Sequence, residues 1–266
     1  MFESFYGFKE TPFSRTIPTG NLYRGNDSDE LIERLIYAAK RQLFAVLTGD
    51  SGTGKTTTLR RFRDELAGTK YIILYISDSK LTPTGFYKSL LEQMGFESCN
   101  LRSTAKRRLH KEIETMKSVH GSIPVAIVDE SHLLNREMLE EVRFLLNYKM
   151  DSQSPMALIM AGQSELWEKL KLQNYAAIRQ RIDVVCAVGH LDRIQTTEYI
   201  STHLAFAGCD KEIFSEAAID DVFSFSGGIP RLINKACTCS LMYCAQNRKA
   251  IIDDRMVKLV IEHELS

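Results

Sequence analysis

Eight consecutive residues, Gly49 to Thr56, have the types and spacing of a phosphate-binding loop. They match the pattern G-x-x-x-x-G-K-[ST], in which backbone N–H groups of a glycine-rich turn surround a phosphate. In this pattern Lys55 reaches the β- and γ-phosphates and the Thr56 hydroxyl holds Mg²⁺. The residues predicted to bind the nucleotide here are Gly49, Asp50, Ser51, Gly52, Thr53, Gly54, Lys55, Thr56 and Thr57.

Two neighbouring carboxylates, Asp129 and Glu130, directly follow the apolar run Pro124–Val128. In a P-loop hydrolase the first carboxylate at such a strand end holds Mg²⁺, usually through water, and the second polarises the attacking water. Asp129 is therefore the predicted metal carboxylate and Glu130 the predicted general base. The alternative, compatible with the first, is that the pair caps the next helix. Because no guanine-reading N-K-x-D follows, the pattern favours ATP over GTP.

Polar side chains also stand beside two later apolar runs. Gln163 follows one of them and is a candidate sensor of the γ-phosphate, with capping of the next helix as the alternative role. Arg179 and Arg181 precede the last run, where an arginine is placed to enter a neighbouring subunit's site and stabilise the transferring phosphoryl charge. A surface salt bridge is the alternative for each arginine.

The elements that must position these residues follow from the alternation of apolar runs and helical patterns. Near-continuous apolar strands separated by helices are typical of a parallel sheet covered on both faces. From Asp192 onward the pattern is helical. We predict an α/β P-loop domain over 1–190, with a five-stranded parallel sheet flanked by helices, and a small all-α lid domain over 191–266. The predicted strands are Leu43–Leu47, Tyr71–Ile76, Val125–Val128, Met156–Ala161 and Ile182–Val188.

The composition is that of an ordinary globular chain. Lys plus Arg and Asp plus Glu both number 34, so any basic surface must be local. No apolar run approaches the roughly 18 residues of a membrane span, and the N-terminus lacks the order of a signal peptide. We therefore expect no membrane contact and a cytoplasmic location. The six cysteines are expected to be reduced thiols in or near the core, and the spacing of Cys237, Cys239 and Cys244 is not that of a zinc site.

One basic segment stands out against this neutral balance. A predicted helix over 105–114 has an inner apolar stripe of Leu109, Ile113 and Met116. The stripe leaves Lys106, Arg107, Arg108 and Lys111 largely outward, and Arg102 lies in the connection before the helix. The candidate contacts to DNA phosphates, without sequence reading, are Arg102, Lys106, Arg107 and Lys111. The alternative is a solvated helix face paired with Glu112 and Glu114. An assembly would repeat a small patch many times and so multiply weak contacts.

The motifs together resemble an AAA+ ATPase over essentially the entire chain. They also resemble one branch of that family, which contains general-secretion-pathway protein A (the ExeA type) and the ATPases encoded beside transposases, of the TniB, TnsC and MuB kind. The residues that carry the resemblance are Phe5-Tyr6-Gly7-Phe8, Pro12-Phe13, Leu22-Tyr23, Leu47-Thr48-Gly49, Gly52 to Thr57, Val128-Asp129-Glu130, Ala161-Gly162-Gln163, Arg179 to Ile182 and Gly228 to Asn234.

The resemblance implies roles for matching positions. It implies that Gln163 is the first sensor, that Arg179 or Arg181 is the finger acting in trans, and that Arg231 is the second sensor, with Tyr23 also at the nucleotide. Two positions depart from the pattern. Ser131-His132 follows Glu130 where many members carry Ala-Gln or Ala-His, and Asp27 to Glu30 stands where members often place a histidine, so that histidine's role is not transferred.

The resemblance implies two different biological roles. The secretion-type proteins continue beyond their ATPase domain, whereas the length of this sequence resembles the transposition regulators. We therefore expect a regulator of DNA transposition that binds double-stranded DNA, forms a ring or helical filament of copies of itself, recruits a transposase and disassembles on ATP hydrolysis. The alternative is a secretion-associated or protein-remodelling ATPase that acts on a protein partner.

Overall fold

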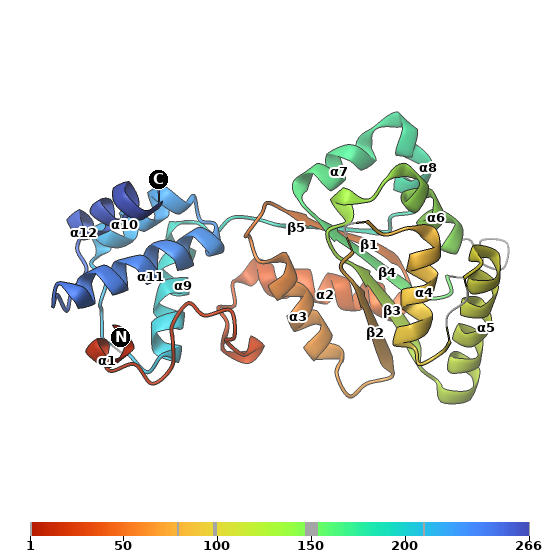
Figure 1. The fold of residues 1–266 in the computed structure, drawn as a ribbon, viewed down its shortest axis with the longest axis horizontal. Coiled ribbons are helices and arrows are strands. Elements are labelled where there is room, and N and C mark those ends of the chain that lie inside the picture. The colour runs from red at the N-terminus through yellow and green to blue at the C-terminus, as the bar shows by residue number, and fades with distance from the viewer. Residues whose placement is uncertain (1, 79, 98–99, 147–153, 210, 266) are drawn as a thin grey trace. The chain divides into compact units, whose positions relative to one another are not determined.

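The computed structural model describes residues 2–78, 80–97, 100–146, 154–209 and 211–265. The chain forms two compact units (Figure 1). Unit 2 comprises Asp27–Ser51 and Lys55–Val188, and unit 1 comprises Met1–Asn26, Gly52–Gly54 and Gly189–Ser266. The change at residues 188 and 189 lies close to the predicted division after residue 190.

A five-stranded, all-parallel sheet forms the centre of unit 2, in the order β2-β3-β4-β1-β5. All five predicted strands are present, each within two residues of its predicted bounds. Every residue of β1 and β4 is buried, as expected for inner strands of a sheet that is covered on both faces. The strands are β1 (Phe44–Gly49), β2 (Tyr71–Ile76), β3 (Ile123–Val128), β4 (Ala157–Gly162) and β5 (Val184–Val188).

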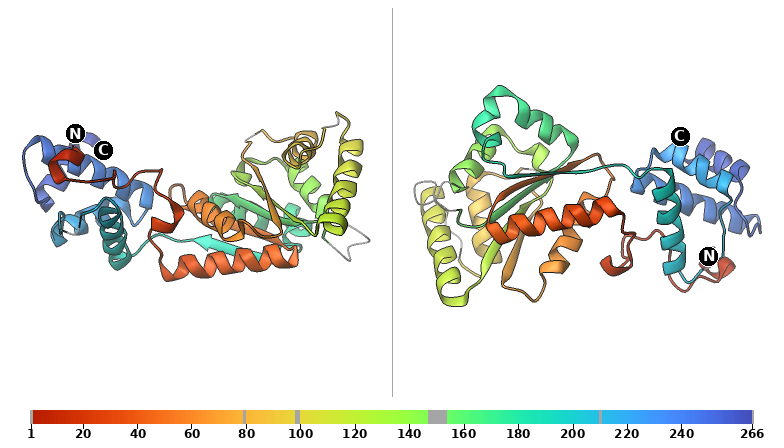
Figure 2. Two further views of the ribbon diagram at one scale, coloured as in Figure 1. Left: turned by 90° about the horizontal axis from the view of Figure 1, so that it is seen from below. Right: turned by 180° about the vertical axis from the view of Figure 1, so that it is seen from behind.

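Helices cover both faces of this sheet (Figures 1 and 2). Side chains alternate between the faces of a strand, so Ala45 and Leu47 of β1 pack against α2 (Asn26–Arg41) and α3 (Lys55–Leu66). Phe44 and Val46 belong to the core on the opposite face. The helices on that face are α4 (Pro83–Gln93), α5 (Arg102–His120), α6 (Arg136–Leu146), α7 (Ser164–Lys171) and α8 (Ala176–Arg179).

Local sequence explains where these helices begin. Thr82 caps α4, since its hydroxyl accepts a hydrogen bond from the Gly85 amide at 3.1 Å, and Pro83 takes the first helical position. The helix α5 extends beyond the predicted span of 105–114 in both directions. Its predicted inner stripe, Leu109, Ile113 and Met116, is buried. Short helical turns complete unit 2: η2 (Ser131–Leu133) and η3 (Gln173–Tyr175).

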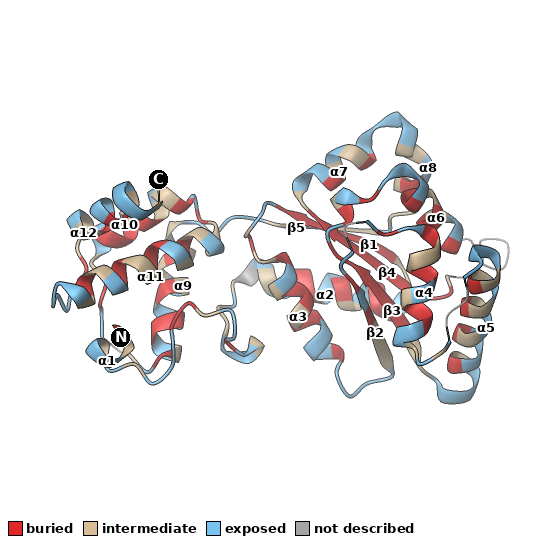
Figure 3. Ribbon diagram, viewed as in Figure 1, coloured by how far each residue is buried: buried red, intermediate tan, exposed pale blue. Residues whose placement is uncertain are grey.

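Unit 1 is helical, as expected for the C-terminal part of the chain. The predicted division did not anticipate that the N-terminal segment packs with these helices, which it does because Phe2 and Phe13 are buried in their core. Buried residues line the inner sides of the helices (Figure 3). The elements are α1 (Phe2–Tyr6), η1 (Thr19–Asn21), α9 (Arg193–Phe206), α10 (Glu216–Ser226), α11 (Pro230–Gln246), α12 (Asp254–Val260) and η4 (Ile261–Leu265).

The five cysteines in the described residues are free thiols, as expected, and three of them are buried: Cys186, Cys237 and Cys244. The sixth, Cys99, lies outside the described residues. None of the helices in the described ranges combines the length and apolar character needed to cross a bilayer.

A buried histidine, His203 of α9, lies in the core of unit 1 and is 1% exposed. Its ring stacks on Phe13, with centroids 5.3 Å apart, and lies 4.2 Å from the ring centroid of Tyr199. Among the residues that the structure describes, neither ring nitrogen has a hydrogen-bond partner. Burial therefore lowers the pKa of His203 to about 4 from its ordinary value of 6.5, so the folded unit holds the ring neutral.

We predict that unit 1 loses stability as the pH falls from 6.5 towards 4. In that window the unfolded chain binds a proton at His203 that the folded chain does not. The free energy of unfolding therefore falls by about 3 kcal/mol across the window. Replacing His203→Phe keeps the aromatic packing and removes this contribution, so the variant's free energy of unfolding, measured by denaturant titration at several pH values, should change less with pH. The exposed His263→Phe should keep the wild-type dependence. Parallel pH profiles for wild type and His203→Phe would contradict the assignment.

Candidate nucleotide site

The predicted phosphate-binding loop joins the end of β1 to the start of α3. The helix begins at Lys55. Gly52 and Gly54 have φ values of +89° and +109°, a backbone conformation that side-chain-bearing residues rarely adopt. These glycines are therefore required by the path of the loop itself.

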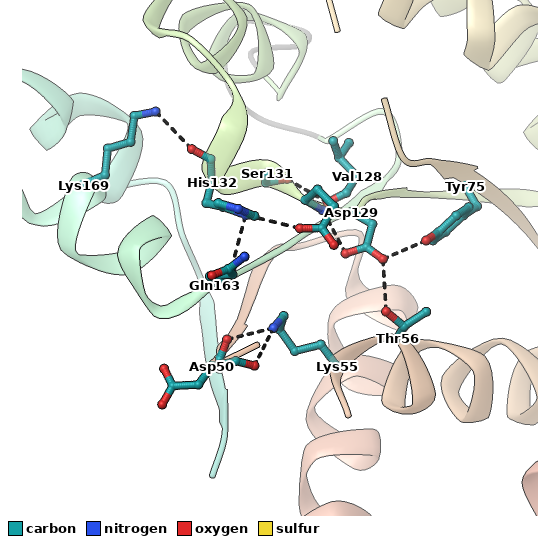
Figure 4. Close-up of polar contacts among 12 residues, drawn as sticks. Asp50, Lys55, Thr56, Tyr75, Val128, Asp129, Ser131, His132, Gln163 and Lys169 are labelled. Carbon is teal, nitrogen blue, oxygen red and sulfur yellow. Dashed lines mark hydrogen bonds and ion pairs between the residues drawn. The ribbon is translucent and has the colours of Figure 1, made fainter. Parts of the chain in front are cut away.

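Lys55 is buried, and its ammonium group lies on the loop's own carbonyl oxygens (Figure 4). Its Nζ donates to Gly49 O at 2.8 Å and to Asp50 O at 2.9 Å. Phosphate oxygens carry negative charge and would accept stronger hydrogen bonds from this ammonium group than neutral carbonyls do. The loop therefore fits a phosphate group at this position.

The structure brings Asp129 beside this loop, as the two motifs predict. Asp129 is 4% exposed, and its Oδ2 atom lies 3.5 Å from Thr56 Oγ1, although the residues are 73 positions apart. Its Oδ1 atom accepts a hydrogen bond from the Glu130 amide at 2.8 Å. A hydroxyl and a carboxylate are the oxygen ligands that Mg²⁺ prefers. Thr56 and Asp129 therefore fit the metal role together.

Tyr75, which belongs to none of the sequence motifs, is a third partner of this carboxylate. Its hydroxyl donates to Asp129 Oδ2 at 2.7 Å from the neighbouring strand β2 (Figure 4). Partial burial, followed by the hydrogen bond to Asp129, raises the pKa of Tyr75 above its usual range, so the hydroxyl stays protonated and donates. The sequence feature that could have pointed to Tyr75 is its place as a tyrosine near the end of β2, the strand that pairs with β3.

Glu130 stands at the start of η2 in a left-handed conformation, with φ of 53°. Its side chain is 47% exposed and makes no capping hydrogen bond to η2, so capping is not what the carboxylate does here. Its Oε2 atom lies 3.5 Å from Nδ1 of His132. The carboxylate is therefore open to solvent at the end of β3, where a general base must meet water.

Gln163 stands at the end of β4, immediately before α7. It occupies the N-cap position of α7, but its side chain makes no capping hydrogen bond, so the alternative role is not the one seen. The next residue, Ser164, donates its hydroxyl to Asp50 Oδ1 at 2.6 Å and so ties the phosphate loop to the start of α7. The end of β4 is thereby joined to the predicted nucleotide site.

The two candidate finger arginines differ in their surroundings. Arg179 ends α8, and its guanidinium donates to the carbonyl of Leu170 at 3.4 Å and to that of Lys171. It thus satisfies carbonyl groups at the C-terminal end of α7. Arg181 is half-buried just beyond α8.

Two predicted nucleotide contacts lie in unit 1. The Tyr23 hydroxyl donates to Glu198 Oε2 at 2.7 Å, and its ring packs edge-on against Tyr199. Arg231 is the second residue of α11 and is exposed. Its backbone N–H donates to Gly52 O at 3.2 Å, within the same unit.

The four candidate DNA contacts divide into two pairs. Arg102 and Lys106 both donate to the carboxylate of Glu141, which is 1% exposed and also accepts a hydrogen bond from Tyr87. Burial alone would raise the pKa of Glu141, but the Tyr87 hydrogen bond and the two cations lower it, so the carboxylate is ionised. Lys106 is therefore turned towards the protein rather than outward as expected.

Arg107 and Lys111, the other pair, are exposed on the opposite side of α5 from its buried stripe. Neither forms an ion pair with a carboxylate in the described part of the chain. The expected pairing on this helix involves Arg108 instead, whose Nε atom lies 3.9 Å from Glu112 Oε1.

A five-stranded parallel sheet defines a P-loop nucleotide-binding protein when a lysine-bearing glycine loop follows one strand and paired carboxylates follow another at the same edge. Comparison with known proteins refines this class. A protein-family model described as an AAA domain matches residues 38–170. General secretion pathway protein A of Aeromonas hydrophila is 30% identical over 246 residues, which cover 91% of this chain and 44% of that protein. The chain thus spans less than half the length of this relative.

Solved structures agree on the fold. Drosophila ORC bound to DNA has a TM-score of 0.72 at 17% identity, covering 96% of this chain and 64% of that one. Cdc6p from Pyrobaculum aerophilum has a TM-score of 0.69 at 16% identity, covering 94% and 68%. The Thermotoga maritima RuvB Holliday junction branch migration motor has a TM-score of 0.61 at 20% identity, covering 91% and 69%. The chain belongs to the AAA+ ATPase family.

We predict that Tyr75→Phe weakens the response to Mg²⁺. The change removes the hydroxyl that orients the Asp129 carboxylate, and loss of such a partner typically costs tenfold or more in metal affinity. The Mg²⁺ concentration for half-maximal ATP hydrolysis should rise about tenfold. The control is Tyr37→Phe, an exposed tyrosine of α2. An unchanged Mg²⁺ titration in Tyr75→Phe would show that Asp129 needs no such support.

Proposed function

We propose that this protein binds ATP with Mg²⁺ and hydrolyses it, releasing the γ-phosphate. The observation that supports this most directly is the meeting of Thr56 with Asp129, which joins the phosphate loop to the strand end that carries Glu130. The proposal assigns the parts of a nucleotide hydrolase to the carboxyl ends of β1, β3 and β4. These are a cation for the phosphates, oxygen ligands for the metal, and an accessible carboxylate for water.

The roles follow from the surroundings of each side chain. Lys55 exchanges its loop carbonyls for β- and γ-phosphate oxygens, while Thr56 and Asp129 hold the metal ion. Bound Mg²⁺ neutralises charge that develops on the phosphates. Glu130 accepts a proton from the attacking water, and Gln163 orients towards the γ-phosphate from the end of β4.

We propose that hydrolysis requires a neighbouring copy of the chain. Arg179 and Arg181 are the candidates to cross into that copy's site and stabilise the phosphoryl charge. Because Arg179 already satisfies the carbonyls of Leu170 and Lys171, its use as a finger would require those contacts to break. ATP would in this way favour a homo-oligomer, whether ring or filament.

The finer proposal is that assembly takes place on double-stranded DNA and recruits a transposase. The cations Arg107 and Lys111 support it, since both are exposed on α5 and have no carboxylate partner within the described ranges. The motifs shared with the transposon-encoded branch also support it. Drosophila ORC was solved bound to DNA, but its 17% identity carries the fold alone. The proposal therefore rests on α5 and on the shared motifs.

A secretion-associated or protein-remodelling role is the second candidate. The observation that favours it is the 30% identity to General secretion pathway protein A over 91% of this chain. In this case the assembly would act on a protein partner. Both candidates require the same ATP site and differ in what the assembled surface binds.

We predict opposite effects for two substitutions in the ATP site. Glu130→Gln should lower hydrolysis by at least a hundredfold, because it removes the general base, while ATP binding persists and oligomers accumulate. Lys55→Ala should lose ATP binding and, with it, nucleotide-dependent DNA binding. Turnover, binding of a fluorescent ATP analogue and sedimentation would be measured on both variants. Hydrolysis by Glu130→Gln at the wild-type rate would show that another group is the base.

We predict that the four cations of α5 divide into two classes when each is replaced by alanine. Arg107→Ala and Lys111→Ala should each weaken binding to a nonspecific DNA duplex, with no loss of stability. Each should also lower the slope of log affinity against log salt concentration by about 1. Arg102→Ala and Lys106→Ala should lower the free energy of unfolding, because each removes a partner of buried Glu141. Anisotropy across a salt series and denaturant titration would measure the two effects.

The same duplex titration separates the two candidate functions. Binding that requires an ATP analogue, weakens with salt and forms large species would support the DNA-assembling regulator. Absence of DNA binding in every nucleotide state, with ATP turnover intact, would favour the protein-directed alternative.

A further inference from the structure

One side chain in the site has no role in the function proposed above. His132 lies in η2, two residues after Glu130, and its side chain is 9% exposed. Its Nδ1 atom has two polar neighbours, and Figure 4 shows the contact with Gln163. The backbone nitrogen of Gln163 is 3.4 Å away and Glu130 Oε2 is 3.5 Å away.

The two neighbours make opposite demands on this nitrogen. The Gln163 amide is a donor, so it needs an Nδ1 atom that carries no proton. The Glu130 carboxylate is an acceptor, so it needs an Nδ1 atom that carries one. A neutral imidazole satisfies one demand or the other, according to its tautomer. The histidine therefore makes the position of Gln163 and the orientation of Glu130 depend on one another.

The backbone around His132 is held firmly. Lys169 of α7 donates to the carbonyl oxygens of His132 at 3.5 Å and Leu134 at 2.5 Å, and the Ser131 hydroxyl donates to Val128 O at 2.7 Å. A Cβ atom on Gly162 would lie 3.0 Å from the His132 backbone nitrogen, which is a tight contact, so glycine favours the close approach of β4 to this turn. With the backbone fixed, the side chains of His132 and Glu130 are what can move.

We propose that His132 is a positioning residue for ATP hydrolysis, whose Nδ1 atom links the Glu130 carboxylate to the backbone N–H of Gln163. This inference rests on the proposed function, because it requires Glu130 to be the general base and Gln163 to be the sensor. The turn at the end of β4 thereby sets the direction in which the Glu130 carboxylate points. His132 touches neither substrate nor metal in this scheme and acts through Glu130.

The test compares His132→Ala, His132→Asn and His132→Gln in ATP hydrolysis by the full chain. Asparagine carries its amide at the place of Nδ1, whereas glutamine carries it about one bond further, near the place of Nε2. His132→Ala and His132→Gln should lower kcat between tenfold and about a hundredfold, with KM for ATP within about twofold of wild type, as expected for a misplaced base. His132→Asn should recover most of the loss. His120→Ala, an exposed histidine of α5, is the control.

A second measurement does not depend on turnover. The ¹⁵N shift of His132 Nδ1 and the amide signal of Gln163 should both change in Glu130→Gln, because loss of the carboxylate charge alters which partner the nitrogen serves. The same signals should stay at their wild-type positions in His120→Ala. An unchanged Nδ1 shift in Glu130→Gln would overturn the link.

The outcomes separate this inference from the function on which it rests. If wild type hydrolyses ATP and Glu130→Gln does not, but His132→Ala keeps the wild-type kcat, the function stands and the role of His132 is overturned. Equal losses in His132→Asn and His132→Gln would overturn it as well, because they would show a need for the ring and not for the Nδ1 contact. If wild type hydrolyses no ATP, the proposed function fails first.

Discussion

The site depends on one constraint, which is that the carboxyl ends of parallel strands meet at the same edge of a sheet. In this chain the ends of β1, β3 and β4 carry the phosphate loop, the paired carboxylates and Gln163. Residues far apart in sequence thereby become neighbours, as Thr56 and Asp129 show. Helices on both faces bury the strands, and that burial keeps water from competing for the hydrogen bonds that hold the strands in register.

The two buried charged groups at this edge, Lys55 and Asp129, both have uncharged hydrogen-bond partners. Lys55 rests on backbone carbonyls, and Asp129 accepts from a tyrosine, a threonine and an amide. These contacts reduce the cost of burying each charge without neutralising it. In the proposed function an ATP–Mg²⁺ complex would supply the opposite charges. The exposed carboxylate of Glu130 completes the set.

The helix α5 shows how neighbouring residues of one type come to serve different purposes. Its basic character is evident from the sequence, but Arg102 and Lys106 neutralise a buried carboxylate on α6, whereas Arg107 and Lys111 face solvent. Helical periodicity predicts which residues share a face. It does not predict that Glu141, 35 residues beyond Lys106, will be buried against that face. The stabilising pair and the exposed pair therefore became distinguishable only in the folded chain.

The sequence by itself determined the strands of the sheet, the phosphate loop and the two carboxylates, because each depends on a local pattern of apolar, glycine and charged residues. Only the tertiary structure decided the parts that depend on pairing between distant segments. These are the hydrogen bond from Tyr75 to Asp129, the packing of Phe13 and His203 in unit 1, and the position of His132 between Glu130 and Gln163. Such contacts are set by strand order and helix packing, which bring together residues that no local spacing relates.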